Sequence, residues 1–237
     1  IIAAESKPTA AVSACPGWTN TELLDHVSMV WSFVAAQVAA RTPDGPARPD
    51  TDGPGGPSEE LDHLLGLLNA SDPGAAAWTW TPDRTVGFFV RRMAHENVIH
   101  RWDAEEATGG ESPINADVAV DGIDEVLEVG MVYRSQGDAV EYPSDSLHLH
   151  RTDGDGEWLI SAADGHLRVT REHAKGDAAV RGPPMVCCST CGTAAGKAWS
   201  ASATRRWSTP GPRSRPEPPS ARFPAYDPNE GAHLARV

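Results

Sequence analysis

A carboxylate and an imidazole stand four positions apart in residues 95–103, a segment preceded by Phe89 and Met93. Four residues advance an α-helix by about 400°, so Glu96 and His100 project from the same side of a helix, one turn apart. A carboxylate and an imidazole are costly to bury among apolar neighbours unless they are paired or bind a cation. The spacing therefore predicts a pair of metal ligands on one helical face.

The same segment excludes a related motif. In the metalloprotease pattern His-Glu-x-x-His, the two histidines are four residues apart and bind one ion together. Here His95 and His100 are five residues apart, which separates them by about 140° around the helix. An alternative without a metal stays open: Glu96 pairs with Arg92 one turn before it, and His100 is a hydrogen-bonded core histidine.

A second helix is predicted from its start signal. Thr19 and Glu22 have the spacing of a capping box. Trp18 and Leu23 flank them with the spacing of a hydrophobic staple. The apolar residues that follow repeat at helical intervals as far as about Ala40, so we expect a long helix with one buried side.

This helix supplies a third candidate ligand. His26 lies at the edge of its apolar stripe, where a lone histidine is more often structural than a ligand. Together with Glu96 and His100, however, His26 completes a set of two histidines and one carboxylate. That is the ligand number of a catalytic zinc site that keeps one position open.

Two segments in a fixed order carry a family resemblance. The first is Cys15-Pro-Gly-Trp-Thr followed by Leu-Leu-Asp-His26, and the second is Arg91-Arg-Met-Ala-His-Glu followed by His100-Arg-Trp-Asp103. Together they resemble the mycothiol-dependent maleylpyruvate isomerase family. The resemblance implies a DinB-like four-helix bundle as the N-terminal domain. It also implies that zinc, or another divalent metal, is held by His26, Glu96 and His100.

The resemblance also implies a reaction. Mycothiol, a small thiol, would bind the zinc as thiolate, add to the double bond of maleylpyruvate, allow rotation and leave to give fumarylpyruvate. Asp103, one turn beyond His100, has the spacing either to orient that ligand or to pair with a surface arginine. Family members use a basic residue of the C-terminal domain for the substrate carboxylates, and Arg181 is a candidate by its chemistry alone.

Two other functions stay open. One is a mycothiol S-transferase that acts on another electrophile. The other is a metal-binding helical module without catalysis, since the fold of a domain does not by itself fix its function. A ligand set of two histidines and a carboxylate also suits several divalent ions.

Composition narrows the partners. The chain has 237 residues and a net charge of −13, which argues against nucleic-acid binding. No apolar run approaches the roughly 18 residues of a membrane span, and no signal peptide is recognisable. We therefore expect a cytoplasmic protein with a small-molecule substrate and a thiol partner, and no membrane partner. Because the sequence starts at Ile1 without a full first helix, we expect that helix to be truncated.

The chain divides into three segments, and its fold class is predicted as α+β. Residues 1–110 form the helical bundle, whose last helix ends at the Gly109-Gly110 pair. Residues 111–183 form a small α+β domain, with a helix from Asp117 to about Arg134 and three short strands. Residues 184–237 form an irregular tail.

The first of these strands contains a histidine pair. His148 and His150 alternate with Leu147 and Leu149, so both imidazoles lie on one strand face. Such a pair suits a metal. The interpretation that we favour is the outward face of an edge hairpin.

The tail differs in composition from the rest of the chain. Residues 184–237 contain eight prolines, no Ile and one Leu, and seven Lys or Arg against three acids give this segment a charge of +4. Its cysteines Cys187, Cys188 and Cys191 lack the fourth ligand of a zinc knuckle. Read one base out of frame, the run Cys187–Gly192 can encode apolar residues typical of the family's last helix. We therefore favour a frameshifted tail.

Cys15 is expected as a small buried residue, with a reactive thiol as the less favoured alternative.

Overall fold

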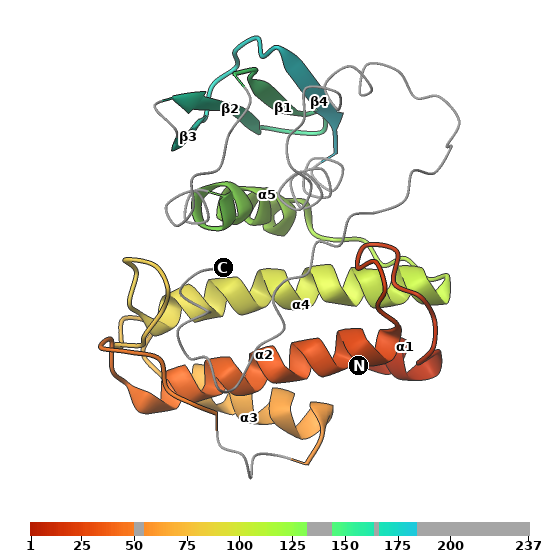
Figure 1. The fold of residues 1–237 in the computed structure, drawn as a ribbon, viewed down its shortest axis with the longest axis vertical. Helices are drawn as coiled ribbons and strands as arrows, with labels where there is room; N and C mark the ends of the chain where they lie inside the picture. Colours follow the sequence, from red (N-terminus) through yellow and green to blue (C-terminus); the bar gives the residue numbers. More distant parts are fainter. Residues whose placement is uncertain (50–54, 132–143, 164–165, 184–237) are drawn as a thin grey trace. The chain divides into compact units, whose positions relative to one another are not determined.

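The chain forms two compact units, Ile1–Pro113 and Ile114–Val237. The computed structural model describes residues 1–49, 55–131, 144–163 and 166–183 (Figure 1). The described part of the first unit is helical, and that of the second combines helix with a four-stranded sheet, so the fold class is α+β. The boundary between the units follows Pro113, three residues after the Gly110 boundary that the sequence predicts. The tail at 184–237 lies outside the described residues.

Three long helices and one short helix make up the described part of the first unit. They are α1 (Ile2–Ser6), α2 (Asn20–Ala40), α3 (Pro57–Ala70) and α4 (Val86–Thr108). α2 and α4 run side by side, α3 packs against α2, and the five-residue α1 contacts both α2 and α4 (Figure 1). Because α2 and α4 are neighbours, side chains that project between them meet although about 70 residues separate them in sequence.

The ends of α2 and α4 follow from local sequence. The predicted capping box is present, with the Glu22 carboxylate accepting a hydrogen bond from the Thr19 backbone N–H at 2.7 Å. Thr85 caps α4 by accepting from the Phe88 N–H at 3.4 Å. Gly109 ends α4 in the left-handed conformation, at φ +84°, which glycine adopts without steric cost.

α2 supplies much of the apolar interior of this unit. Leu23, Val27, Val34 and Val38 are buried on it. Among the described helices, α2 is the one long and apolar enough to cross a membrane by length and composition, so the expectation that no such stretch exists is wrong. This is weak evidence for a membrane, because the core helix of a globular domain passes the same test.

The second unit starts with a helix that changes pitch. Asn115 caps α5 (Ala116–Glu125), which continues as the π-helix η1 (Val126–Met131). The predicted helix therefore starts as expected. Its predicted last turn, residues 132–134, lies outside the described residues.

The sheet that follows has the order β3-β2-β1-β4. Its strands are β1 (Leu147–Arg151), β2 (Glu157–Ala163), β3 (His166–Thr170) and β4 (Ala178–Gly182). β2 is antiparallel to β1 and β3, whereas β4 pairs with β1 in parallel. The fourth strand was not predicted. Because β3 and β4 flank β2 and β1, the β1–β2 hairpin lies in the centre of the sheet, and the interpretation of an edge hairpin is wrong.

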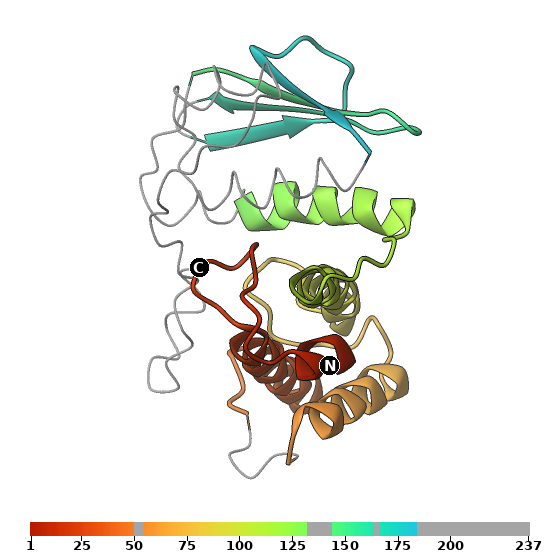
Figure 2. The same cartoon turned by 90° about the vertical axis from the view of Figure 1, so that its right-hand side faces the viewer.

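One face of this sheet packs on α5, as Figure 2 shows. The register places Leu149 beside Trp158 and Val180, and all three side chains are buried. The Trp158 indole N–H donates to the Asp124 carboxylate of α5 at 2.7 Å, which ties the sheet to the helix. Strand alternation puts the side chains of His148 and His150 on the opposite face.

Candidate metal centre

Two neighbouring helices bring the three predicted ligands together. His26 lies in the second turn of α2, and Glu96 and His100 lie one turn apart on α4. We call these three residues the helix cluster. A hydrogen bond at 2.8 Å from the Trp31 indole N–H of α2 to the Asn97 side-chain oxygen of α4 links the two helices beside it.

A single carboxylate oxygen lies between the two imidazoles. Glu96 Oε1 is 3.3 Å from His26 Nε2 and 3.2 Å from His100 Nε2. A tetrahedral zinc ion with bonds of about 2.0–2.1 Å separates its ligand atoms by roughly 3.3–3.4 Å. All three ligand atoms lie within 4.8 Å of one another. The donor set and its spacing therefore fit a divalent metal.

The other oxygen of Glu96 forms the ion pair that the sequence offered as an alternative. Glu96 Oε2 pairs with Arg92, one turn earlier on α4. Desolvation raises the pKa of Glu96, but hydrogen bonds from His100 and His26 and the charge of Arg92 outweigh it and hold the pKa well below its usual range. The two interpretations of Glu96 are therefore compatible, because each carboxylate oxygen serves one of them.

Asp103 engages the second nitrogen of His100. The buried Asp103 carboxylate lies 2.9 Å from His100 Nδ1, so Nδ1–H donates to it and Nε2 is directed at Glu96. Burial lowers the pKa of His100, but the hydrogen bonds to Asp103 and Glu96 outweigh it and raise the pKa to about 9. A carboxylate behind a metal-ligating histidine typically fixes its tautomer and orientation.

Cys15 lies closer to the site than the sequence indicated. Its sulfur, His100 and Asp103 offer ligand atoms within 4.8 Å of one another, a second candidate set that shares His100 with the first. Burial, with the negative charges of Asp103 and Glu96, raises the pKa of the Cys15 thiol to about 12. The thiol is therefore uncharged at neutral pH. The only sequence signal for its position was its place just before the capping box of α2.

Arg181 and His95 lie outside the helix cluster. Arg181 is on β4 in the second unit, where it is exposed and pairs in register with His150. His95 is buried on α4, next to Glu96 in sequence, and is not a member of the helix cluster.

The helical unit thus belongs to a class of helical domains in which two packed helices present two histidines and a carboxylate. Residues 3–105 match the family model described as the mycothiol maleylpyruvate isomerase N-terminal domain, a DinB-like helical domain. The matched segment contains the helix cluster, Asp103 and Cys15. No curated protein and no solved structure matched the chain.

Proposed function

We propose that the chain is a zinc-dependent isomerase in which the sulfur of mycothiol adds to the double bond of maleylpyruvate and later leaves it. The helix cluster would hold the ion. The observation that carries this proposal is the convergence of Glu96 Oε1 with the Nε2 atoms of His26 and His100, in a segment that matches the family. Bound there, a divalent ion would supply the positive charge that keeps a thiol ionised at neutral pH.

The neighbours of the cluster prepare its three donor atoms. Asp103 accepts from His100 Nδ1, so Nε2 is the ring nitrogen that a cation would bind in place of a proton. Arg92 takes one oxygen of Glu96 and leaves the other between the two imidazoles. The Trp18 ring packs against His26 with a centroid distance of 5.0 Å, which restricts rotation of that imidazole.

Cys15 has a separate role in this proposal. Because its pKa is raised to about 12, its thiol stays protonated and does not offer a second nucleophile beside the site. A cation held by the helix cluster would ionise a cosubstrate thiol that contacts it directly.

The proposal extends to the architecture of the unit. We infer that α1, α2, α3 and α4 correspond to the four helices of a DinB-like bundle, with α1 as a short version of the first. The packing of α1 against both α2 and α4 supports this correspondence.

Metal analysis of the purified full-length chain tests the first half of the proposal. We expect His26→Ala to lose one equivalent of zinc relative to the unaltered chain. The matched control is His63→Ala, which removes an exposed histidine of α3 in the same unit. Equal zinc content in both variants would overturn the assignment of the helix cluster.

A thiol-dependent assay tests the second half. Maleylpyruvate is incubated with the zinc-loaded chain with and without mycothiol, and fumarylpyruvate is measured. The proposal requires its formation only when mycothiol is present, with mycothiol recovered unchanged. Mycothiol consumed into a stable adduct would instead indicate an S-transferase. Bound zinc without any turnover would indicate a metal-binding module.

A further inference from the structure

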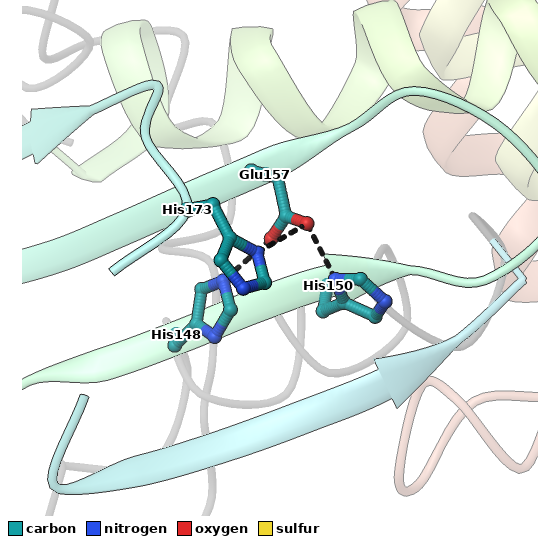
Figure 3. Close-up of side chains that lie close together, drawn as sticks. All are labelled: His148, His150, Glu157 and His173. Carbon is teal, nitrogen blue, oxygen red and sulfur yellow. Dashed lines mark hydrogen bonds and ion pairs between the residues drawn. The ribbon is translucent and has the colours of Figure 1, made fainter. Parts of the chain in front are cut away.

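A second group of histidines gathers around a carboxylate on the sheet of the second unit. We call it the sheet cluster; its members come from β1, from β2 and from the loop between β3 and β4 (Figure 3), and they are His148, His150, Glu157 and His173. It shares no residue with the helix cluster. The family match ends at residue 105, so the match does not cover this group.

The strand register explains why three of these residues meet. His148 and His150 are two positions apart on β1 and therefore project from the same face of the sheet. The antiparallel pairing of β1 with β2 sets Glu157 directly opposite His150. Cross-strand neighbours of this kind have side chains close enough to interact.

The fourth member arrives from the loop between β3 and β4, and that loop is anchored at both ends. At its start, Arg171 Nε donates to the Asp124 carboxylate of α5 at 3.1 Å. At its end, the Asp177 carboxylate accepts from the Ser146 backbone N–H and hydroxyl, each at 2.8 Å. These anchors hold His173 over the strand pair.

All three imidazoles direct a nitrogen to the same carboxylate, as the dashed lines in Figure 3 show. His148 Nε2 lies 2.5 Å from Glu157 Oε2. His150 Nδ1 and His173 Nδ1 lie 2.5 Å and 2.9 Å from Glu157 Oε1. The ring centroids are 5.4–6.0 Å apart, so the rings surround the carboxylate and are not stacked on one another.

We propose that the sheet cluster is a second metal site, with three imidazoles and one carboxylate as ligands for a divalent transition-metal ion such as zinc. One ligand atom from each residue lies within 4.8 Å of every other. The ligand atoms of a tetrahedral zinc ion are roughly 3.3–3.4 Å apart. Imidazole nitrogen with one carboxylate oxygen suits zinc and its neighbours better than calcium or magnesium, which prefer oxygen ligands throughout.

The number of ligands assigns this site a structural role. A zinc ion with four protein ligands keeps no position for a substrate, whereas catalytic sites usually have three. The side chain of His148 is 10 % exposed and that of His173 is 76 % exposed. An ion would therefore contact buried ligands on the sheet and be reached from solvent on the side of the loop. When bound, it would join β1, β2 and the β3–β4 loop.

A zinc titration of the full-length chain tests this proposal. The helix cluster is first disabled by His100→Ala, and the remaining site is titrated against a chromophoric chelator. We expect one equivalent of zinc to bind. We also expect His173→Ala, in the exposed loop, to weaken that binding at least tenfold. The matched control is His166→Ala, which removes an exposed histidine from the edge strand of the same sheet and is expected to leave the affinity unchanged.

Two further readouts keep the test decisive. Cobalt is used as a spectroscopic probe, and the visible absorption of a four-coordinate ion is expected in the His100→Ala chain and lost in its His173→Ala derivative. Circular dichroism checks that both variants are folded. Failure of the folded His100→Ala chain to bind zinc would overturn the proposal, as would equal affinities of the His173→Ala and His166→Ala variants. Neither result would bear on the helix cluster.

Discussion

The helix cluster and the sheet cluster both gather imidazoles around one carboxylate. They differ in the number of candidate ligands and in the neighbouring side chains that hold those ligands in place. In the helix cluster, two histidines share one oxygen of Glu96, Arg92 takes the other oxygen, and Asp103 holds the second nitrogen of His100. In the sheet cluster, three histidines engage both oxygens of Glu157.

The comparison shows how the fold sets the number of protein ligands, and so whether a metal ion keeps a coordination position open for another molecule. Two helices can present three donors and use neighbouring side chains to orient them, which leaves one side of an ion for a thiol. Two neighbouring strands present three donors on one sheet face and a loop adds a fourth, so the four would enclose an ion. The same residue types therefore support different chemistry.

The largest expected effect comes from the same substitution in the two carboxylates. Glu96→Gln is expected to weaken zinc binding at the helix cluster by about 100-fold or more, because it removes one of three ligands. Loss of a residue that only hydrogen-bonds a ligand typically costs about 10- to 100-fold. Glu157→Gln leaves three imidazoles and is expected to cost on the order of 10-fold at the sheet cluster. Each is measured by chelator competition in a chain with the other cluster disabled. The reverse order of effects would contradict the comparison.

The pH dependence of stability above pH 6.5 gives the second effect, which concerns the helix cluster. Because the pKa of His100 is raised from 6.5 to about 9 in the folded, metal-free chain, its stabilising contribution is fully present below pH 6.5. That contribution is lost as the pH rises from 6.5 through 9, at most on the order of 3 kcal/mol.

Asp103→Asn sharpens this test, because it weakens the interaction that raises the pKa of His100. The free energy of unfolding is measured by urea denaturation in the presence of a chelator, at pH 6.5 and pH 9. The unaltered chain should lose more stability between these values than the variant. Equal losses would show that Asp103 does not stabilise protonated His100.

A glycine beside the sheet cluster offers a smaller effect. A Cβ at Gly176 would lie 2.8 Å from the Ala178 carbonyl oxygen and 2.8 Å from the His148 backbone nitrogen. Gly176→Ala should therefore displace the loop that carries His173, weaken zinc binding at the sheet cluster and destabilise the chain by about 1–3 kcal/mol. Gly66→Ala on α3 is the control, because a Cβ there meets nothing within 4 Å. Unchanged zinc affinity in Gly176→Ala would show that the loop position is unimportant.

The smallest effect concerns a charge. Arg181 lies next to His150 on the same sheet face and is exposed. Its removal in Arg181→Ala should tighten zinc binding at the sheet cluster only about two- to threefold, since water and salt screen exposed charges. Titrations at low and high ionic strength should show the difference shrinking with salt. A raised KM for maleylpyruvate in this variant would instead assign Arg181 to the substrate.

The sequence by itself determined the features that depend on near neighbours. The capping box places the start of α2 directly after Thr19, and Gly109 ends α4. The spacing of Glu96 and His100 placed both on one face of α4, because an α-helix turns by a constant angle per residue. The pairing of His148 with His150 on one face followed equally from strand alternation.

The family resemblance named His26 as the third ligand, but only the tertiary structure decided that it and the other distant residues meet these pairs. His26 joins Glu96 because α2 packs along α4, and Cys15 lies near His100 because the loop before α2 returns to that point. β4 pairs in parallel with β1, so the chain must cross over from β3, and the loop of that crossover brings His173 to Glu157. The periodicity of a sequence predicts which residues share a face within one helix or strand. Contacts between different elements depend on how those elements pack, and the spacing of residues along the chain does not encode that packing.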